Sequence, residues 1–438
     1  MRIAMIGGGY VGLVSGACFA EFGSEVTVVE TNAGRLAALR DGRMPIFEPG
    51  LDKLVADNVA AGRLNFTDDL AQGLDGAEAV FIAVGTPTRR GDGHADLSYV
   101  YAAAEQVAHA LKGYAVIVTK STVPVGTSRR IREIVQAARP DLEFDVASNP
   151  EFLREGSAIG DFMRPDRVVI GTESERARAV LRQLYRPLYL IEAPIVFTGI
   201  ETAELTKYAA NAFLAMKVTF INEMADLCEK TGADVHDVAR GIGLDGRIGR
   251  KFLHPGPGFG GSCFPKDTLA LVRIAQDFGA PSRLVETVVH VNEARKSGMA
   301  QRIIAAAGGS VRGKTVGVLG LTFKPETDDM RDSPSVPIVA RLVGDGALVR
   351  AFDPEGMDQA MPLLPEAVTY CQNALDAAKG ADVLVIVTEW NEFRALDAGR
   401  LAGAMRGRVI VDLRNVYDPA VMRAAGFAYT GIGRPAEG

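Results

Sequence analysis

Short apolar runs rich in β-branched residues alternate with helical patterns in the first part of the chain. Continuous apolar strands separated by helices predict a parallel sheet that is covered by helices on both faces. Tyr10–Glu21 has the composition of a closely packed apolar helix between the first two of these runs. The runs that predict strands are Arg2–Ile6, Glu25–Glu30, Ala79–Val84, Ala115–Thr119, Asp145–Ser148 and Arg167–Ile170.

The alternation of strand-like and helical segments stops near residue 200 and resumes after Gly313. Glu201 to Lys230 holds no Gly or Pro and keeps helical apolar spacing, which predicts one long helix. Residues 233–300 are also helical in pattern, apart from one loop rich in Gly and Pro. Strands are then predicted at Thr315–Leu319, Leu348–Phe352, Val383–Val387 and Val409–Asp412.

We therefore predict an α/β chain with two Rossmann-like doubly wound domains, joined by a long helix and a helical central region. The expected boundaries are 1–199, 200–305 and 306–438. A length of 438 residues agrees with two or three domains.

The composition argues against a membrane protein, a secreted protein and a nucleic-acid-binding protein. The mean hydropathy is +0.10, but the apolar residues come in short runs and none approaches the ~20 residues of a membrane helix. The N-terminus runs into a Gly-rich turn without a cleavage region, so we expect no signal peptide. A net charge of −6 without a basic block argues against nucleic acid as a partner. We expect neither a membrane nor a nucleic acid partner.

The four cysteines argue against a zinc site or a disulfide framework. They lie far apart, and none belongs to a C-x-x-C pair. We therefore expect no metal, a reducing compartment and a cytoplasmic location. These cysteines are Cys18, Cys228, Cys263 and Cys371.

A dinucleotide-binding turn follows the first predicted strand. Gly7, Gly9 and Gly12 satisfy G-x-G-x-x-G between that strand and a helix, where free N–H groups can face a pyrophosphate. Glu30 ends the second strand, at the position where a carboxylate binds a ribose 2′-hydroxyl and repels a 2′-phosphate. The sequence therefore favours NAD over NADP, although nearby Arg35 is of the type that accommodates NADP. The alternative is a glycine-rich turn beside a surface Glu.

A second unusual segment is the loop His254–Asp267. Its glycines allow the backbone to approach a bulky polar ligand, and Cys263 stands three residues before Lys266, a cation that can stabilise a thiolate. The spacing alone leaves open whether Cys263 is catalytic or structural. NAD together with a thiol would suit the oxidation of an aldehyde through a thiohemiacetal and a thioester, which also requires a base and oxyanion donors. Lys207 and Asn211 share one helix face and are candidates for those donors, with a solvated helix face as the alternative.

The ordered motifs of the chain resemble those of the UDP-glucose 6-dehydrogenase family, within the nucleotide-sugar 6-dehydrogenases. The resemblance covers Met1 to about Asn415. The matching stretches are GGGYVGL, FEPGL, VGTPT, STVPVGT, NPEFLREG, ELTKYAANAF, NEM, GFGGSCFPKD, GLTFKPETDDMRDSP and VDLRN.

The resemblance implies roles for individual residues. Cys263 would be the nucleophile, Lys207 and Asn211 would hold the oxyanion, Asp267 with Thr122 would hold a water, and Glu151 would be the base for thioester hydrolysis. The implied cofactor-binding set is Gly7, Gly9, Tyr10, Val11, Gly12, Glu30, Arg35, Thr86, Thr122, Glu155, Lys266 and Arg331. The implied substrate-binding set is Glu151, Phe152, Leu153, Arg154, Lys207, Asn211, Arg247, Phe252, Gly260, Phe323, Lys324 and Arg414.

The implied reaction is the oxidation of UDP-glucose by two NAD and water to UDP-glucuronate, a nucleotide sugar for polysaccharide biosynthesis. In this scheme the first domain would bind NAD, the middle region would carry the catalytic cysteine and a dimer interface, and the last domain would bind the UDP end. A homodimer is expected, with Arg247 reaching the neighbouring subunit's substrate. Glu30 departs from the usual Asp at the ribose position, and we still expect NAD.

Two alternatives are weighed against this interpretation. The same chemistry could act on GDP-mannose or a UDP-N-acetylhexosamine, but the segments His254–Gly261 and Gly246–Phe252 resemble the UDP-glucose branch more closely. A non-catalytic NAD-binding regulator would not require the set Cys263, Lys207, Asn211 and Glu151.

Overall fold

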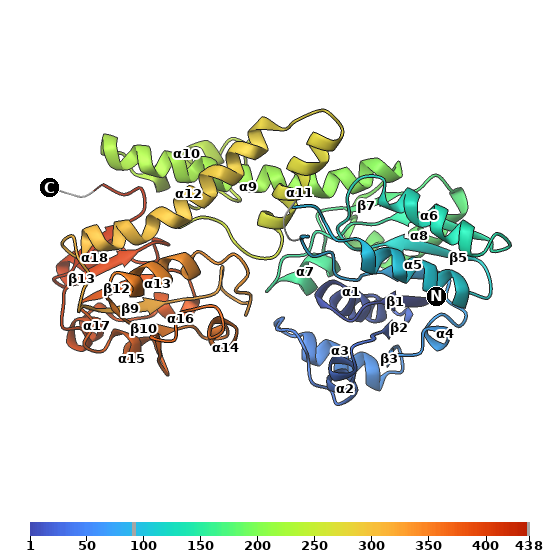
Figure 1. Ribbon diagram of the computed structural model, residues 1–438, viewed down its shortest axis with the longest axis horizontal. Helices are drawn as coiled ribbons and strands as arrows, with labels where there is room; N and C mark the ends of the chain where they lie inside the picture. The colour runs from blue at the N-terminus through green and yellow to red at the C-terminus, as the bar shows by residue number, and fades with distance from the viewer. Residues whose placement is uncertain (90–92, 436–438) are drawn as a thin grey trace. The chain divides into compact units, whose positions relative to one another are not determined.

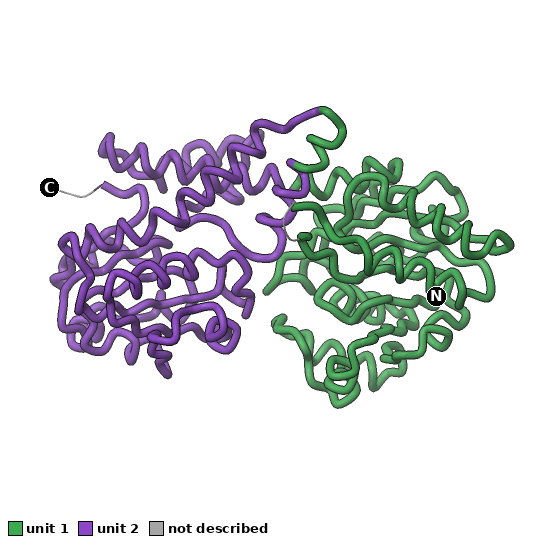
Figure 2. Tube along the Cα trace, viewed as in Figure 1, with its two compact units in different colours: residues 1–210, 273–279 green, residues 211–272, 280–438 purple. Residues whose placement is uncertain are grey.

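The structure is a computed structural model that describes residues 1–89 and 93–435. The chain forms two compact units, which Figure 2 distinguishes by colour. The first consists of Met1–Ala210 with Arg273–Gly279, and the second of Asn211–Val272 with Ala280–Gly438. Two helices therefore belong to both units: α9 (Ile200–Thr231) and α11 (Phe264–Asp277).

The first unit holds an eight-stranded sheet in the order β3-β2-β1-β4-β5-β6-β7-β8. Its neighbouring strands run parallel except β6 and β7, which pair antiparallel through Ser148 and Gly171. The six predicted runs are all strands, and β3 and β8 are two strands that the sequence did not predict. The strands are β1 (Arg2–Ile6), β2 (Glu25–Val29), β3 (Leu64–Thr67), β4 (Ala79–Ile82), β5 (Ala115–Thr119), β6 (Phe144–Ser148), β7 (Val168–Gly171) and β8 (Ile195–Thr198).

Helices cover both faces of this sheet (Figure 1). Alternate residues of β1 face opposite sides: Ile3 and Met5 belong to one buried cluster, while Ala4 and Ile6 belong to another. The first cluster is completed by α1, α3, α7 and α8, and the second by α5 and α6. The helices of this unit are α1 (Tyr10–Glu21), α2 (Ala33–Arg40), α3 (Leu51–Ala60), α4 (Leu70–Gly73), α5 (Ser98–Ala110), α6 (Thr127–Ala138), α7 (Ala158–Met163), α8 (Glu175–Leu184) and the 3-10 helix η1 (Arg186–Ile191).

The second unit holds a six-stranded parallel sheet in the order β11-β10-β9-β12-β13-β14. All four predicted runs are strands here, while β11 and β14 were not predicted. The strands are β9 (Thr315–Leu319), β10 (Leu348–Phe352), β11 (Thr369–Tyr370), β12 (Val383–Ile386), β13 (Val409–Asp412) and β14 (Ala428–Gly431).

The second sheet is also covered on both faces. Val383 and Val385 of β12 face a cluster that includes Ile221 of α9, while Leu384 and Ile386 face the opposite cluster. The C-terminal part of α9 therefore packs on one of the two covered faces of this sheet. Besides α9 and α11, the helices are α10 (Val235–Gly243), α12 (Arg283–Ala306), α13 (Ser335–Gly344), α14 (Met357–Ala360), α15 (Ala374–Ala378), α16 (Asn391–Arg394), α17 (Ala398–Ala404) and α18 (Pro419–Ala424).

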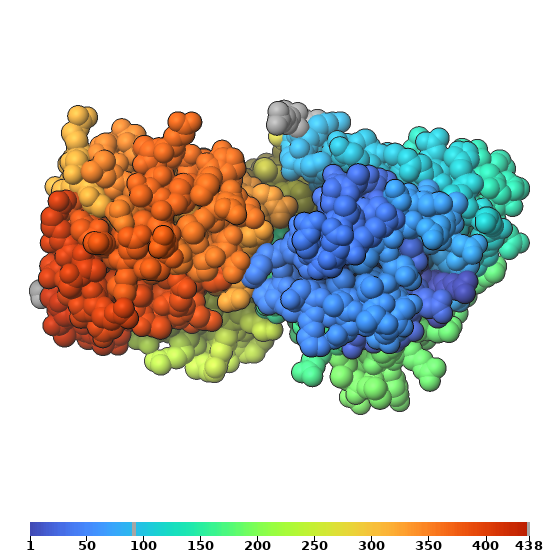
Figure 3. Space-filling model, turned by 90° about the horizontal axis from the view of Figure 1, so that it is seen from below, coloured from blue at the N-terminus to red at the C-terminus, as the bar shows by residue number. Residues whose placement is uncertain are grey.

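Both sheets have the topology of a doubly wound fold. In each, the strand order reverses at the first strand of the sheet, between β1 and β4 and between β9 and β12. Ligands of such sheets bind at the carboxyl ends of the strands at this switch point. In the space-filling view of Figure 3, the blue and cyan residues of the first sheet's unit and the orange and red residues of the second each gather into one body. Among the described residues, the helices all lack the length and apolar character needed to cross a bilayer.

Candidate active site

The glycine-rich turn lies at the switch point of the first sheet. Gly7 has φ +106°, and a Cβ atom there would lie 2.8 Å from the Ala83 carbonyl oxygen. A Cβ atom at Gly12 would lie 1.9 Å from the Gly7 carbonyl oxygen, so α1 can pack this closely only on a glycine. Gly9 is the N-cap of α1; no side chain caps the helix, and the space beside its Cα is open. These features fit a dinucleotide pyrophosphate at the α1 N-terminus.

Glu30 braces this turn from the end of β2. It is buried, and its carboxylate accepts hydrogen bonds from the backbone N–H of Gly8 (3.1 Å) and of Asn32 (2.7 Å). The Arg35 guanidinium, 40% exposed, forms an ion pair with the same carboxylate at 2.8 Å. The charge of Arg35 is thus occupied by Glu30, which fits a ribose hydroxyl better than a 2′-phosphate.

The loops after β4 and β5 are joined by hydrogen bonds. The Thr86 hydroxyl donates to the Thr122 carbonyl oxygen at 3.0 Å, and the Ser121 hydroxyl donates to the Val84 carbonyl oxygen at 2.6 Å. Thr86 and Thr122 were both predicted at the site, and the structure places them together at the carboxyl edge of the sheet.

A buried ion pair stands beside these loops. Glu151, in the loop after β6, accepts a hydrogen bond from Lys207 Nζ of α9 at 2.9 Å, and both side chains are almost fully buried. The second carboxylate oxygen accepts from the Leu153 N–H at 2.6 Å. Burial alone would raise the pKa of Glu151, but Lys207, the Leu153 N–H and nearby Lys120 together hold it below its usual value. Glu151 is therefore an ionised carboxylate at neutral pH.

Lys120 is a buried cation that the sequence analysis missed. Its Nζ donates to Asn149 Oδ1 at 3.1 Å and to the Tyr185 hydroxyl at 3.3 Å, and burial lowers its pKa to about 8. A lysine directly after the apolar strand β5, and just before the STVPVGT motif, was the signal available in the sequence.

The remaining predicted residues of the NPEFLREG segment lie on the rim of the same unit. The Phe152 ring is stacked by the Arg167 guanidinium at 3.5 Å and lies 5.5 Å from Lys207 Nζ. Arg154 forms an ion pair with Asp161 at 2.6 Å, and Glu155 is half-buried.

The first turn of α1 holds two further predicted residues. The Tyr10 hydroxyl contacts Glu48, whose carboxylate also accepts hydrogen bonds from the N–H groups of Gly156 and Ala158. Val11 is half-buried.

Cys263 stands at the N-terminus of α11 in the second unit. Its carbonyl oxygen accepts the Asp267 N–H at 2.8 Å, so Cys263 occupies the N-cap position directly before Phe264, the first residue of the helix. The positive end of a helix dipole favours a thiolate. Cys263 is half-buried, whereas Cys18, Cys228 and Cys371 are buried. Of the four cysteines, Cys263 is therefore the one placed for nucleophilic chemistry.

Asp267 is held between two predicted site residues. Its carboxylate accepts from Asn211 Nδ2 of α9 at 2.6 Å and from Lys266 Nζ at 2.6 Å. Asp267 is 1% exposed, so both bonds form in a desolvated environment. The structure thus brings Asn211 of α9 together with Lys266 and Asp267, which lie in the first turn of α11 just after Cys263.

The glycines before Cys263 allow its loop to pack on residues 323–332. A Cβ atom at Gly260 would lie 2.4 Å from the Asp332 carbonyl oxygen, and one at Gly261 would lie 2.6 Å from the Phe323 ring. The Gly261 N–H donates to the Arg331 carbonyl oxygen at 2.7 Å. The Arg331 side chain forms an ion pair at 2.8 Å with Asp329, whose carboxylate also accepts the Ser262 N–H.

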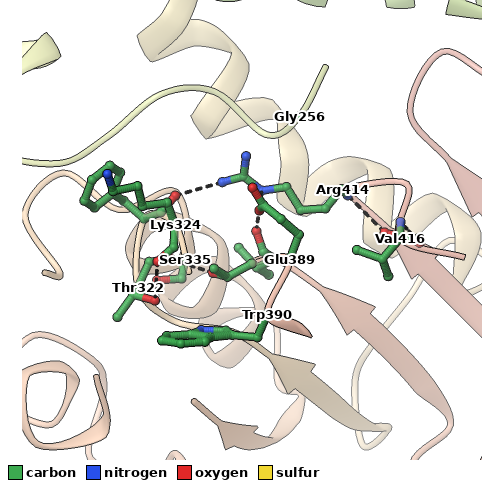
Figure 4. Close-up of polar contacts among 12 residues, drawn as sticks. Gly256, Thr322, Lys324, Ser335, Glu389, Trp390, Arg414 and Val416 are labelled. Carbon is green, nitrogen blue, oxygen red and sulfur yellow. Dashed lines mark hydrogen bonds and ion pairs between the residues drawn. The ribbon is translucent and has the colours of Figure 1, made fainter. Parts of the chain in front are cut away.

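Lys324 and Arg414 lie at the switch point of the second sheet (Figure 4), and Arg414 contacts the backbone of Phe323 there. The Arg414 guanidinium donates to the carbonyl oxygens of Phe323 (2.9 Å) and Val387 (2.8 Å) and lies 3.1 Å from the Glu389 carboxylate. Lys324 Nζ lies 5.2 Å from the Phe323 ring centroid. Glu389 is a residue that the sequence analysis missed, because its position beside Arg414 depends on the pairing of β12 with β13.

Two predicted site residues, Arg247 and Phe252, lie apart from the group formed by Phe323, Lys324 and Arg414. Arg247 is 90% exposed and pairs with Asp245 at 2.6 Å. Phe252 has φ +65°, and its ring centroid lies 5.9 Å from that of Phe264, the first residue of α11. Phe252 is thus close to the beginning of the cysteine helix, and Arg247 is presented to solvent.

Three parts of the chain match models of one family. Residues 1–189 match the NAD binding domain of the UDP-glucose/GDP-mannose dehydrogenase family, residues 201–294 its central domain and residues 317–419 its UDP binding domain. These matches confirm the resemblance that the motifs predicted and the expected NAD cofactor.

Relatives of known name match over the full length. A UDP-glucose 6-dehydrogenase of Rhizobium meliloti (strain 1021) is 61% identical over 437 residues, covering 99% of this chain and 100% of the relative. The UDP-glucose 6-dehydrogenase TuaD of Bacillus subtilis (strain 168) is 47% identical, covering 99% and 94%. A solved UDP-glucose dehydrogenase from Pyrobaculum islandicum superposes with a TM-score of 0.90 at 40% identity, covering 99% and 98%. The predicted fold class is confirmed by this likeness.

Proposed function

The chain belongs to the UDP-glucose/GDP-mannose dehydrogenase family, and on that premise we propose that it oxidises C6 of UDP-glucose to the carboxylate of UDP-glucuronate. The observation that carries this proposal is Cys263 at the positive end of α11, followed within one turn by Lys266 and Asp267, with Asn211 of α9 bonded to Asp267. A thiol in this position is suited to adding to an aldehyde.

NAD fits the first unit, where Gly7 and Gly12 permit the tight turn and close packing of α1, Gly9 leaves room for the pyrophosphate, and Glu30 faces the ribose position. When bound, it supplies the hydride acceptor. The chain's own residues then determine which carbon loses hydride, where protons go and how water is admitted.

The proposed covalent sequence keeps the substrate on the enzyme between two oxidations. Oxidation of the C6 alcohol gives an aldehyde, to which Cys263 Sγ adds to form a thiohemiacetal. Loss of the second hydride from C6 gives a thioester; water then adds to C6, the C–S bond breaks and the thiolate returns. The overall reaction converts one UDP-glucose, two NAD and one water to UDP-glucuronate and two NADH, with release of three protons.

Positively charged and amide donors on α9 would hold the C6 oxygen during these steps. Lys207 and Asn211 lie four residues apart on α9, which places them one turn apart on the same helix face. Asp267 and Thr122 would hold the water, and Glu151 would accept its proton during thioester hydrolysis. Glu151 is kept ionised by Lys207, which is the protonation state that a base requires.

The UDP end would bind at the second switch point, along the edge that carries Lys324 and Arg414. Phe323 and Gly260 would border the uridine and sugar, and the family resemblance assigns Phe152, Leu153 and Arg154 to substrate binding as well. We accordingly assign residues 1–199 to NAD binding, 200–305 to the cysteine loop and dimerisation, and 306–438 to UDP binding. On the cofactor side, Tyr10, Val11, Arg35, Thr86, Glu155, Lys266 and Arg331 complete the proposed contacts.

We also propose a homodimer formed through α9. Phe213, Phe220 and Leu227 recur every seven residues along this helix, and each side chain is about half exposed. Such a row lies on one helix face and is apolar enough to pair with a second copy. The exposed Arg247 is available to reach the neighbouring subunit's substrate. Sedimentation should show a dimer that Phe213→Asp/Phe220→Asp dissociates, while the control Glu223→Ala leaves it intact; a monomeric native chain would refute the interface.

A cytoplasmic location and a role in polysaccharide biosynthesis complete the proposal. Four free cysteines, one of them a nucleophile, suit a reducing compartment. A UDP-activated uronic acid is the form of the sugar that a glycosyl transfer reaction consumes.

The test is the yield of NADH per UDP-glucose consumed. We expect two NADH per UDP-glucose without release of free aldehyde, and no steady turnover by Cys263→Ser, with an ester adduct on the serine visible by mass spectrometry. Cys228→Ser is the matched control, because that thiol belongs to α9 and is buried in a hydrophobic cluster. One NADH per substrate, preferential oxidation of GDP-mannose, or near-normal turnover by Cys263→Ser would each contradict the proposal.

A further inference from the structure

Asp353 is a fully buried carboxylate at the end of β10, next to the proposed UDP site. Its Oδ2 accepts the N–H groups of Leu321 (2.7 Å) and Thr322 (3.1 Å) and the indole N–H of Trp390 (3.1 Å). Its Oδ1 accepts the N–H groups of Glu355 (3.1 Å) and Gly356 (2.8 Å). The Thr322 hydroxyl lies 3.1 Å from Oδ2 and is shared with the Lys324 carbonyl oxygen. The negative charge is thus satisfied by donors from the ends of three neighbouring strands.

This carboxylate occupies the same topological position as Glu30 in the first sheet. Each follows the second strand of its sheet and binds the backbone of the turn that follows the first strand. Glu30 accepts two backbone N–H groups and pairs with the partly exposed Arg35. The hydrogen bonds that the Asp353 carboxylate accepts all come from groups inside the protein. It is therefore not arranged to bind a ribose hydroxyl and holds the turn instead.

The turn held by Asp353, residues 321–324, is fixed on its other side as well. The Thr388 hydroxyl donates to the Thr322 carbonyl oxygen, and the Ser333 hydroxyl donates to the Leu321 carbonyl oxygen at 2.6 Å. A Cβ atom at Gly356 would lie 2.3 Å from Thr322 Cγ2, so the packing leaves no room for a shift in that direction. The N–H and carbonyl groups of Leu321 and Thr322 are therefore all occupied.

The same carboxylate reaches Arg414 through a short chain of contacts. Trp390, the single tryptophan of the chain, is buried and donates to Asp353; the preceding residue, Glu389, lies 3.1 Å from the Arg414 guanidinium. Arg414 in turn donates to the Phe323 carbonyl oxygen at 2.9 Å, within the turn that Asp353 holds. Figure 4 shows Trp390, Glu389, Arg414 and Lys324 around this turn.

We propose that Asp353 is a positioning residue for UDP binding, which sets the place of Phe323, Lys324 and Arg414 by fixing the 321–324 turn and Trp390. The inference rests on the proposed function, because it assumes that these residues receive the UDP group. An asparagine at 353 has the same size, but its amide nitrogen must face at least two N–H donors whichever way it is turned. The turn must then move, and the UDP contacts move with it.

The test compares UDP and NAD binding by calorimetry in the full-length native chain and in Asp353→Asn. We expect UDP affinity and the KM for UDP-glucose to worsen by about tenfold or more, because hydrogen bonds to a buried charge are lost. NAD affinity and kcat should stay within about twofold, which a general loss of folding would not allow. Asp382→Asn is the matched control: Asp382 also accepts a β9 N–H, that of Thr315, but at the opposite end of the strand.

A second variant keeps the inference testable if Asp353→Asn fails to fold. Trp390→Phe removes one N–H donor and retains an aromatic ring, and we expect about threefold weaker UDP binding. If the native chain binds UDP and the folded variants bind it equally well, Asp353 has no positioning role. That result would leave the proposed function standing. A native chain that binds no UDP would refute the proposed function and the inference with it.

Discussion

Replacing Lys207 by methionine removes the cation from a buried ion pair and leaves Glu151 without it. The Lys207 and Glu151 side chains are only 3% and 6% exposed, so solvent does little to compensate for the loss. Breaking a buried pair by removing one partner costs about 3–5 kcal/mol, against at most about 1 kcal/mol for an exposed pair. In a unit of this size, each kcal/mol lowers Tm by about 2–4 °C. We therefore expect Lys207→Met to lower the Tm of the first unit by about 10 °C near pH 7.5.

The pH dependence of this loss has a definite sign. In the native chain the pKa of Glu151 is lowered, so its carboxylate contributes stability above the usual carboxyl pKa and loses it as the pH falls through the lowered value. Without Lys207, burial dominates and raises the pKa of Glu151, so the variant is most stable with Glu151 protonated and loses stability as the pH rises. The difference in Tm between native and variant should therefore shrink when the pH is lowered from about 7.5 to about 5.

Differential scanning calorimetry of the full chain measures both effects. Glu151→Gln added to Lys207→Met should recover much of the lost Tm, because no buried charge is then left unpaired. Lys53→Met is the matched control, since the Lys53–Asp57 ion pair is exposed and its removal should leave Tm unchanged. A Tm for Lys207→Met within about 2 °C of the native value near pH 7.5, or a difference that does not shrink in acid, would refute the reasoning.

Three further predictions concern the ligands and the thiol. Glu30→Gln should lower the preference for NAD over NADP, measured as the ratio of kcat/KM, by about tenfold, since the charge that repels a 2′-phosphate is removed; an unchanged ratio would argue against its ribose role. Gly261→Ala should weaken UDP binding far more than NAD binding, because its Cβ would overlap the Phe323 ring, whereas Gly249→Ala shares the strain of a positive φ without a clash; equal effects of the two would contradict this. Iodoacetamide should modify Cys263 well before the three buried cysteines and abolish activity, as peptide mass mapping can check; faster labelling elsewhere would remove the case for a favoured thiolate.

The sequence predicted those strands whose apolar runs are continuous. β1, β5, β9, β10 and β13 have the predicted bounds, because buried parallel strands are apolar on both faces. Strands at or near the sheet edges were missed: Val196 of the edge strand β8 is 46% exposed, so its run is short and less distinct. Half-exposed strands do not form the continuous apolar runs from which the other strands were predicted.

The candidate site was predictable where a motif carries its chemistry in adjacent residues. The turn at Gly7–Gly12 and the cluster after Cys263 are local, and their geometry follows from a strand end and a helix start. The surroundings of Lys120 and Asp353 were not predictable, because their partners come from positions that are distant along the chain. Both sheets have an acidic residue after their second strand, Glu30 and Asp353, and only the tertiary contacts distinguish a ribose ligand from a residue that holds a turn.

The course of the chain through α11 has a consequence for dividing or recombining this protein. The chain leaves the first unit after Ala210, re-enters it for Arg273–Gly279 and leaves again, so one cut cannot separate the two units. A fragment ending at Ala210 would lose Asp277, whose carboxylate lies 3.1 Å from the His94 ring within the first unit. A chimera that exchanged the first unit with that of a relative would therefore have to carry two separate segments, the second including the end of α11, the helix that follows Cys263. Such an exchange would leave Cys263 in the second unit, and the new junction would lie inside the helix that follows this cysteine.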